Sequence, residues 1–333
     1  MYKILITCLL FVCANGYAQT PDSRQLHETA KTFLKQGDYP NAILVLNRVI
    51  QSDPKNIEAT KDLAWSYYFQ KDNAKALDII KPLLDNDQAD EQVFVIAGNI
   101  YNESRQEKES EKIFRKGLKK FPESGLLYNE LGGLLLSQRN YDAILQWEKG
   151  IETDPGYAKN YYDAAKYYFL TMDKVWSIVY AEIYLNMEPN GSKTPEIKAL
   201  LLDSYKKLFT NVDVEMNNKD KNSFVKAFLQ TMNKQTSVAA QGINAETLTM
   251  IRTRFLLDWN YTHSSKFPYY LFDYHRKLLE EGMFDAYNQW IFGSAQNLAS
   301  FQNWVNTHST EYSAFTAFQR SREFKMRAGQ YYH

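Results

Sequence analysis

Apolar residues in the N-terminal half of the chain recur every three to four positions. Between Phe94 and Pro122, two such apolar stretches flank a polar segment at 102–108, and the proline closes the unit. Residues three and four positions apart lie on the same face of a helix, so each stretch has one apolar side to bury. The pattern therefore predicts two helices joined by a turn, which have to pack against each other and against a neighbour.

This helix-turn-helix pattern recurs about every 34 residues. Prolines end the units at spacings of 68, 33 and 34, the first being two periods: Pro54, Pro122, Pro155 and Pro189. Small residues mark the second helices at spacings of 34, 34, 33 and 34: Ala42, Ala76, Ser110, Ala143 and Ser177. Because the two sets agree, the sequence predicts five units, at 23–56, 57–90, 91–124, 125–157 and 158–191.

The units resemble the tetratricopeptide repeat. The first unit carries the match at 35–39, 42–43 and 52–54, and the fourth at 131–132, 141–144 and 153–155. The resemblance implies an all-α solenoid, because such units bury their apolar faces only by stacking. One position of the first helix is small in every unit, which lets the second helix approach closely: Ala30, Ala64, Gly98, Gly132 and Ala165.

The array is expected to end in a capping helix. Pro195–Leu208 is amphipathic, and a polar stretch at 217–222 follows it. The 34-residue register is then lost, although helical spacing continues. The predicted organisation is a signal peptide at 1–18, a repeat array at 23–191, a capping helix and linker at 192–216, and an all-α, aromatic-rich domain at 223–333.

One residue breaks the local pattern. Pro82 lies inside the predicted second helix of the second unit. A proline inside a helix costs about 3 kcal/mol, because it removes a hydrogen bond and clashes with the preceding turn. We expect a kink centred on Asp78–Pro82.

Aromatic residues are dense between Phe255 and Phe292, where there are twelve in 38 residues. One interpretation is an aromatic helical core with tyrosine hydroxyls at its rim. The other is a surface for a partner protein or a glycan, since aromatic side chains dominate binding hot spots. Glycan binding requires Trp259, Tyr261 and Trp290 to be exposed in one concave patch.

The first residues have the pattern of a cleaved signal peptide. Lys3 is followed by an apolar run at 4–14, and Gly16 and Ala18 are small residues before a cleavage point at Gln19. A lipoprotein signal ending at Cys13 is the alternative, although Val12 is not the small residue that such a signal needs. Both cysteines of the chain lie in this segment, so we expect an exported protein without disulfides.

Composition and motifs argue against several function classes. Lys and Arg number 39, as do Asp and Glu, and this balance disfavours a nucleic-acid binder. No phosphate-binding, dinucleotide, zinc-protease or serine-hydrolase motif occurs. His275 has no carboxylate at i+4, and we expect it to be a partly exposed histidine on an amphipathic helix. The basic run Arg320–Arg327 is either a solvated face or a contact for an anionic surface. We expect no cofactor, no metal and no catalytic residue.

The resemblance implies that the first helices line a concave groove. The partner-binding positions expected there are Lys31, Lys61, Trp65, Tyr68, Phe69, Asn99, Asn102, Asn129, Tyr162, Lys166 and Phe169, with Leu136 and others beside them. The family's clamp for acidic chaperone tails is not assembled, since Val95 and Glu130 stand where it needs Lys and Asn. Apolar anchors mixed with amides suit a peptide or a partner helix.

These observations lead to one functional prediction. The chain is expected to be a non-enzymatic, protein-binding scaffold or adaptor of the bacterial cell envelope or periplasm, associated with a membrane only through its partners. One alternative is a glycan-binding envelope component that uses the C-terminal aromatics. Another is an enzyme with a site near His263 and His275, which requires both histidines to meet a carboxylate in one pocket.

Overall fold

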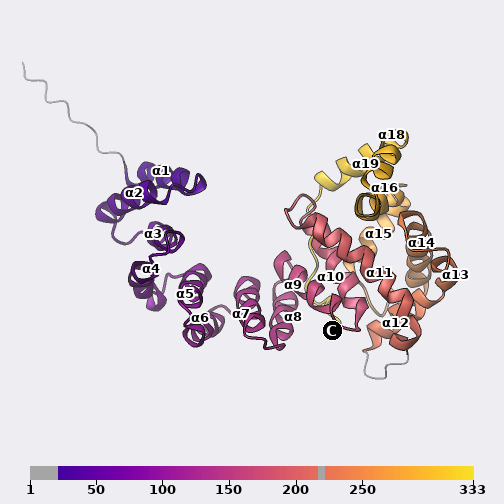
Figure 1. Cartoon of the computed structure of the whole chain (residues 1–333), viewed down its shortest axis with the longest axis horizontal. Helices are drawn as coiled ribbons and strands as arrows, with labels where there is room; N and C mark the ends of the chain where they lie inside the picture. The colour runs from indigo at the N-terminus through magenta and orange to yellow at the C-terminus, as the bar shows by residue number, and fades with distance from the viewer. Residues whose placement is uncertain (1–21, 217–221) are drawn as a thin grey trace, which may run out of the picture. The chain divides into compact units, whose positions relative to one another are not determined.

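The computed structural model describes residues 22–216 and 222–333, with the side chains of 211–216 left out (Figure 1). The predicted signal peptide lies outside the described residues. All regular structure in the described chain is helical, and helical repeats of the tetratricopeptide type are followed by an aromatic-rich helical region. The predicted fold class is therefore confirmed. The chain forms two compact units, which divide between Ala89 and Asp90.

The first unit consists of two helix pairs. Its helices are α1 (Ser23–Lys35), α2 (Tyr39–Ser52), α3 (Ile57–Phe69) and α4 (Asn73–Ile80). Each helix begins at a residue whose side chain accepts a hydrogen bond from a backbone N–H of the first turn, which satisfies a group that the helix leaves unpaired: Asp22, Asp38, Asn56 and Asp72. The core of α1–α3 is formed by small and aliphatic residues: Ala30, Ala42, Leu46, Val49, Ala59 and Leu63.

Pro82 ends α4 as an α-helix. The chain continues from Ile80 into a 3-10 helix, η1 (Lys81–Asp85). Because proline has no N–H, it cannot bond the carbonyl of Asp78, and the tighter helix takes over. The break expected at Asp78–Pro82 is thus a change of helix type, not a bend in a continuous α-helix.

The turn inside the helix pairs repeats one backbone geometry. Gly37, Lys71, Arg105 and Arg139 are 34 residues apart and have φ of 73°, 63°, 58° and 60°. In each turn the next N–H bonds a carbonyl five residues earlier, as from Asp38 to Phe33 at 2.9 Å. This is the Schellman ending of a helix, which needs one residue in the left-handed region. The sequence pointed to it only at Gly37.

The second unit begins with three further helix pairs. They are α5 (Glu91–Glu103) with α6 (Glu107–Lys120), α7 (Gly125–Ser137) with α8 (Ala143–Thr153), and α9 (Ala158–Phe169) with α10 (Lys174–Met187). Gly98 and Gly132 lie directly against the rings of Phe114 and Trp147. The small position predicted in the first helix thus makes room for an aromatic ring of the second.

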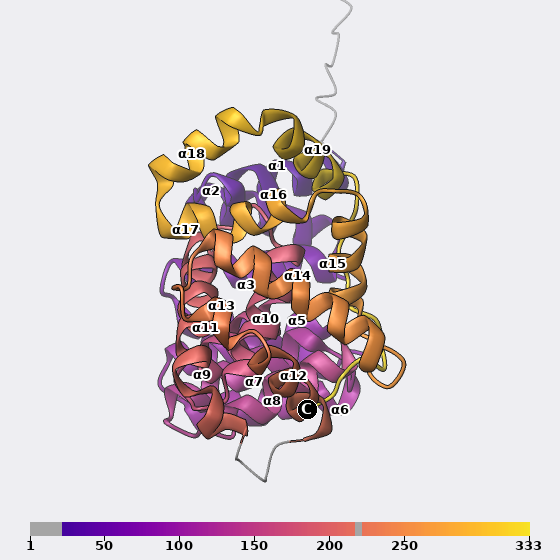
Figure 2. The same ribbon diagram turned by 90° about the vertical axis from the view of Figure 1, so that its right-hand side faces the viewer.

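The C-terminal helices pack onto the end of the array, within the second unit. They are α11 (Thr194–Met216), α12 (Ser223–Asn233), α13 (Thr236–Ala239), α14 (Ala245–Thr262), α15 (Tyr270–Glu280), α16 (Phe284–Asn288), the π-helical turn η2 (Gln289–Gly293), α17 (Ser294–Gln296), α18 (Leu298–Thr307) and α19 (Ser309–Arg320). Residues 174–186 of α10 are all buried, because α9, α11 and α12 contact this helix. In Figure 2, α18 extends along the edge of the unit, and none of its residues is buried.

The aromatic residues of 255–292 form a core. Trp259 is fully buried and Trp290 is 7% exposed, whereas Tyr261 is 92% exposed on the outside of α14. Phe224 of α12 lies between Trp176 of α10 and Trp259, with ring centroids 5.4 Å from each. The three residues do not form an exposed patch, so the glycan-binding alternative is wrong. None of the described helices combines the length and apolar character of a membrane span.

Candidate partner-binding surface

A cluster of aromatic rings lies at the surface of the first unit. Trp65, Tyr68 and Phe69 of α3 have ring centroids 5.0–5.4 Å from one another, and Tyr39 of α2 stacks on Phe69 at 5.0 Å. Phe69 is 50% exposed, and Trp65 and Tyr68 are half-buried. Rings that are held by their neighbours and remain in contact with water are suited to anchor a partner. We call Tyr39, Trp65, Tyr68 and Phe69 the α3 cluster.

The two lysines predicted for the groove in this unit differ in position. Lys31 is half-buried at the surface, and its Nζ lies 2.9 Å from Oε1 of Glu28. Lys61 is buried, with 3% of its side chain exposed, and its Nζ lies 2.7 Å from Oε1 of Glu58. Lys61 therefore supports α3 from inside and does not present its ammonium group to a partner.

The asparagines predicted for the second unit also differ in position. Asn99 is half-buried and Asn102 is exposed, both on α5. Asn129 of α7 is buried and donates a hydrogen bond to Asp163 of α9 at 2.8 Å. Burial raises the pKa of the Asp163 carboxyl, and the bond from Asn129 partly offsets this. Asn129 thus joins two first helices and is not free to read a ligand.

The second unit has an apolar hollow of about 610 Å³ beside the end of α9. We call this the α9 hollow, and its lining includes Leu136, Tyr141, Lys166, Phe169, Leu170 and Leu200. Leu170 is 84% exposed, and Leu136 and Tyr141 are exposed as well. Apolar side chains that meet in one concave place are typical of a binding surface, whereas scattered ones are not. The predicted residues Lys166 and Phe169 therefore lie together here.

Polar groups hold one side of the α9 hollow in place. Nζ of Lys166 lies 2.8 Å from Glu196 of α11, and the Tyr162 hydroxyl donates to the same carboxylate at 3.1 Å. The hydrogen bond to Glu196 raises the pKa of Lys166 to about 12, so the lysine is charged at neutral pH. Nζ of Lys207 lies 3.5 Å from the ring centre of Phe169. The arrangement can bind an apolar group next to a charged rim.

The sequence did not point to most residues of this hollow, among them Tyr141, Leu170 and Leu200. Tyr141, Leu170 and Leu200 come from the α7–α8 turn, the end of α9 and α11, respectively. A signal for Leu170 was present, because Leu170, Thr171 and Met172 place two large apolar residues where a polar turn is expected. The prediction that these residues share one groove with the α3 cluster stays a prediction.

His275 is buried, which corrects the expectation of a partly exposed histidine. Its Nε2 lies 2.9 Å from Oε1 of Glu182, deep in the C-terminal core. His263 does not contact this pair but packs on Trp259, with ring centroids 5.1 Å apart. Among the described residues, no group of three or more His, Cys, Asp or Glu side chains could hold a metal ion.

Residues 33–94 match the model of the tetratricopeptide repeat family. The chain thus carries helical repeats of the tetratricopeptide type. Repeats of this type generally bind peptides or proteins. No curated protein matches the sequence.

Among solved structures, the chain is similar to pilF of Pseudomonas aeruginosa, with 16% identity, 62% of this chain and 96% of that chain covered, and a TM-score of 0.47. It is also similar to the thermophilic TPR protein TTC0263 of Thermus thermophilus. The identity is 12%, the match covers 56% of this chain and 99% of that chain, and the TM-score is 0.44. A third similar structure is YrrB, described as a TPR protein with an unusual peptide-binding site. The identity is 16%, the match covers 56% of this chain and 92% of YrrB, and the TM-score is 0.37.

Proposed function

We propose that the chain is an exported, non-enzymatic scaffold of the bacterial cell envelope that binds a peptide or a helix of a partner protein. The observation that carries the binding role is the α9 hollow, in which the exposed Leu170 and the half-buried Phe169 lie beside the charged Lys166. An apolar side chain of a partner would leave water on entering it, which is the main source of affinity at such sites.

The α3 cluster supplies a second anchor of the same kind. Its rings are already fixed against one another, so binding orders few additional side chains and loses little conformational entropy. A partner segment with apolar residues at helical or extended spacing could bind such an anchor.

A capture experiment from a bacterial envelope extract tests the binding role. The wild type is compared with Phe169→Ala/Leu170→Ala and with Trp65→Ala/Tyr68→Ala. The matched control is Leu257→Ala/Tyr261→Ala, which removes two exposed apolar side chains of α14 outside both surfaces. We expect one or both surface variants to lose a specific partner at least tenfold, while the control retains it. Equal capture by all four proteins, each still helical by circular dichroism, would contradict the proposal.

Export is tested separately. Deleting residues 1–18 should leave the protein in the cytosol, whereas the complete chain should be recovered from the envelope with its first residues removed. Recovery of the shortened chain from the envelope would refute the export proposal and leave the binding role to be decided by the capture experiment.

A further inference from the structure

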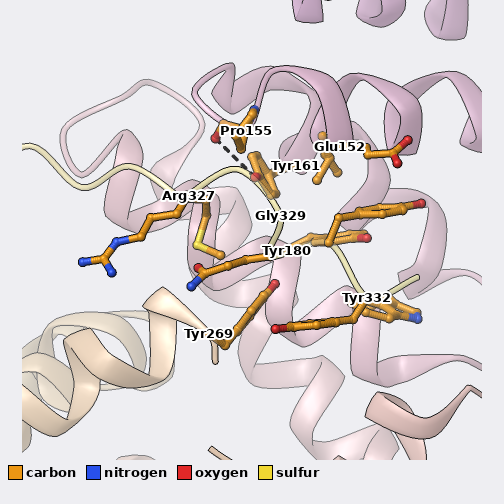
Figure 3. A pocket seen from close by; sticks show the side chains of 13 residues that line it. Glu152, Pro155, Tyr161, Tyr180, Tyr269, Arg327, Gly329 and Tyr332 are labelled. Carbon is orange, nitrogen blue, oxygen red and sulfur yellow. Dashed lines mark hydrogen bonds between the residues drawn. The ribbon is translucent and has the colours of Figure 1, made fainter. Parts of the chain in front are cut away.

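After α19 the chain runs back across the second unit as an irregular segment with a turn at 328–329, residues 324–333, which we call the tail. Residues 322–327 and 330–333 form neither helix nor strand, and 327–329 are exposed. Figure 3 shows the part with Arg327 and Gly329 passing Tyr161, Tyr180 and Tyr269, three tyrosines from different elements. The tail thus lies between the end of the repeat array and the C-terminal helices, and we call the surface that it covers the groove.

Side chains hold the last residues of the tail in this groove. The ring of Tyr332 stacks on Phe224 at 5.1 Å, and its hydroxyl donates to the carbonyl of Pro268 at 2.8 Å. The Tyr332 carbonyl accepts a hydrogen bond from Nδ2 of Asn222 at 2.7 Å. Oε1 of Gln330 accepts one from the backbone N–H of Tyr270 at 2.9 Å.

His333 completes the contact on the array. Its Nδ1 lies 3.1 Å from Oε2 of Glu148 on α8, and its Nε2 lies 2.7 Å from the hydroxyl of Tyr168 on α9. Tyr168 in turn donates to Oε1 of Glu148 at 2.5 Å. Glu148 is buried, so the imidazole pairs with a carboxyl group that has little contact with water. The tail is thus held through the ring of Tyr332, its backbone carbonyl and the imidazole of His333. Contacts of these kinds, spaced along a short segment, resemble those of a bound peptide ligand.

The groove contains one polar atom that the tail leaves unpaired. Tyr180 of α10 is 1% exposed and lines the space beneath the tail, and its hydroxyl has no hydrogen-bond partner among the described residues. A buried hydroxyl without a partner costs free energy, because it has given up its bonds to water. The tail therefore fills the groove but leaves the Tyr180 hydroxyl without a hydrogen bond. A ligand that forms a hydrogen bond with this hydroxyl would bind more tightly than the tail does.

We propose that the groove beneath the tail is a binding site for an extended segment of another protein, and that the tail occupies it as an internal ligand. The partner segment would carry two adjacent aromatic residues followed by a hydrogen-bonding ring or amide, with a further polar group that reaches Tyr180. This site goes beyond the function proposed above, because the groove and the α9 hollow share no lining residue.

The probe for this proposal is a fluorescent peptide with the sequence of residues 324–333. It is titrated into the complete chain, into a tail-release variant with Tyr332→Ala/His333→Ala, and into a control with Glu323→Ala/Lys325→Ala. The control residues are exposed, Lys325 in the tail and Glu323 directly before it, and they form an ion pair of 2.8 Å with each other. We expect the tail-release variant to bind the peptide at least tenfold more tightly than the wild type and the control.

Two tyrosines of the groove provide a matched pair in the tail-release background. Tyr168→Phe removes a hydroxyl that bonds His333, so it should weaken peptide binding at least fivefold. Tyr180→Phe removes a hydroxyl that the tail does not use, so it should leave binding within twofold. Circular dichroism confirms that each variant is folded.

Three outcomes would overturn the proposal. One is equal affinity of the peptide for the wild type and the tail-release variant. Another is no binding to a folded tail-release variant. The third is concentration-dependent dimerisation of the wild type that Tyr332→Ala/His333→Ala abolishes, which would assign the groove to the tail of a second copy.

Discussion

The repeats and the C-terminal region of the second unit are held together in different ways. From α5 to α9, each helix packs mainly on its neighbours in sequence, and most of the buried side chains are small or apolar. The C-terminal helices converge instead on Glu182, a buried carboxylate of α10, from positions 70 to 105 residues away in sequence. Local apolar packing is visible as a period in the sequence, whereas a buried charge cluster is not.

The cluster around Glu182 joins four helices. Its carboxylate bonds Arg252 of α14, the Tyr287 hydroxyl of α16 at 2.8 Å, and His275 of α15 at 2.9 Å. Burial alone would raise the pKa of Glu182, but the charges of Arg252 and His275 and the hydrogen bonds from His275 and Tyr287 outweigh it and hold the pKa at about 2. The carboxylate is therefore charged in the core at any ordinary pH, and its partners depend on it.

The largest effect is expected for Glu182→Gln. The change leaves the Arg252 guanidinium buried without its counter-charge, and breaking a buried pair in this way costs about 3–5 kcal/mol of unfolding free energy. Urea unfolding at pH 7 measures it. Glu188→Gln, at the exposed end of the same helix, is the control and should stay within about 0.5 kcal/mol of the wild type. A loss below about 1 kcal/mol for Glu182→Gln would show that the C-terminal region does not depend on this cluster.

The matching test of the repeats uses two adjacent glycines of α7. A Cβ on Gly132 would lie 2.3 Å from Nε1 of Trp147, whereas a Cβ on Gly133 would meet nothing within 4 Å. We expect Gly132→Ala to destabilise by about 1–3 kcal/mol through overpacking. Gly133→Ala should stabilise by about 0.5–1 kcal/mol, because alanine loses less backbone entropy in a helix. Thermal and urea unfolding of the two variants measure this, and equal effects would contradict close packing at Gly132.

A smaller effect is expected where the array meets the tail, at Glu148. Burial raises the pKa of this carboxyl to about 7, although the bond from Tyr168 opposes the rise. Between pH 4.5 and 7 the unfolded chain releases the proton and the folded chain keeps it, so folding loses up to about 1.4 kcal/mol per pH unit as pH rises. Burial lowers the pKa of His333, which faces the carboxyl.

Glu148→Gln should remove this loss, because glutamine cannot ionise. The unfolding free energy of the variant minus that of the wild type should therefore grow by about 1–2 kcal/mol from pH 5 to pH 7. Taking the difference between the two proteins cancels the titration of groups that do not contact residue 148. A difference that stays constant over this range would mean that Glu148 is already ionised at pH 5.

The sequence predicted the parts of the molecule that repeat. The 34-residue register located the helix pairs, and the small positions at Gly98 and Gly132 located their closest contacts. It did not reveal Glu182, because that residue's partners come from three other helices and share no spacing with it. It also placed Lys61 and Asn129 at the groove surface, although both are buried. Position within a repeat specifies the helix face but not the depth of a side chain.

The smallest effect concerns a repeat feature that the sequence hides. Arg139 has φ of 60°, in the left-handed conformation that Gly37 provides in the first turn. An L-residue pays about 1–2 kcal/mol there, while glycine adds about 0.5–1 kcal/mol of backbone entropy to the unfolded chain. Arg139→Gly should therefore stabilise by about 0.5–1 kcal/mol. Gln138→Gly, one residue earlier at φ of −81°, should destabilise, because glycine there relieves no strain and only raises the backbone entropy of the unfolded chain. Urea unfolding of the two variants measures the difference. A loss of stability in both would show that contacts of the Arg139 side chain stabilise the fold by more than the left-handed backbone conformation costs.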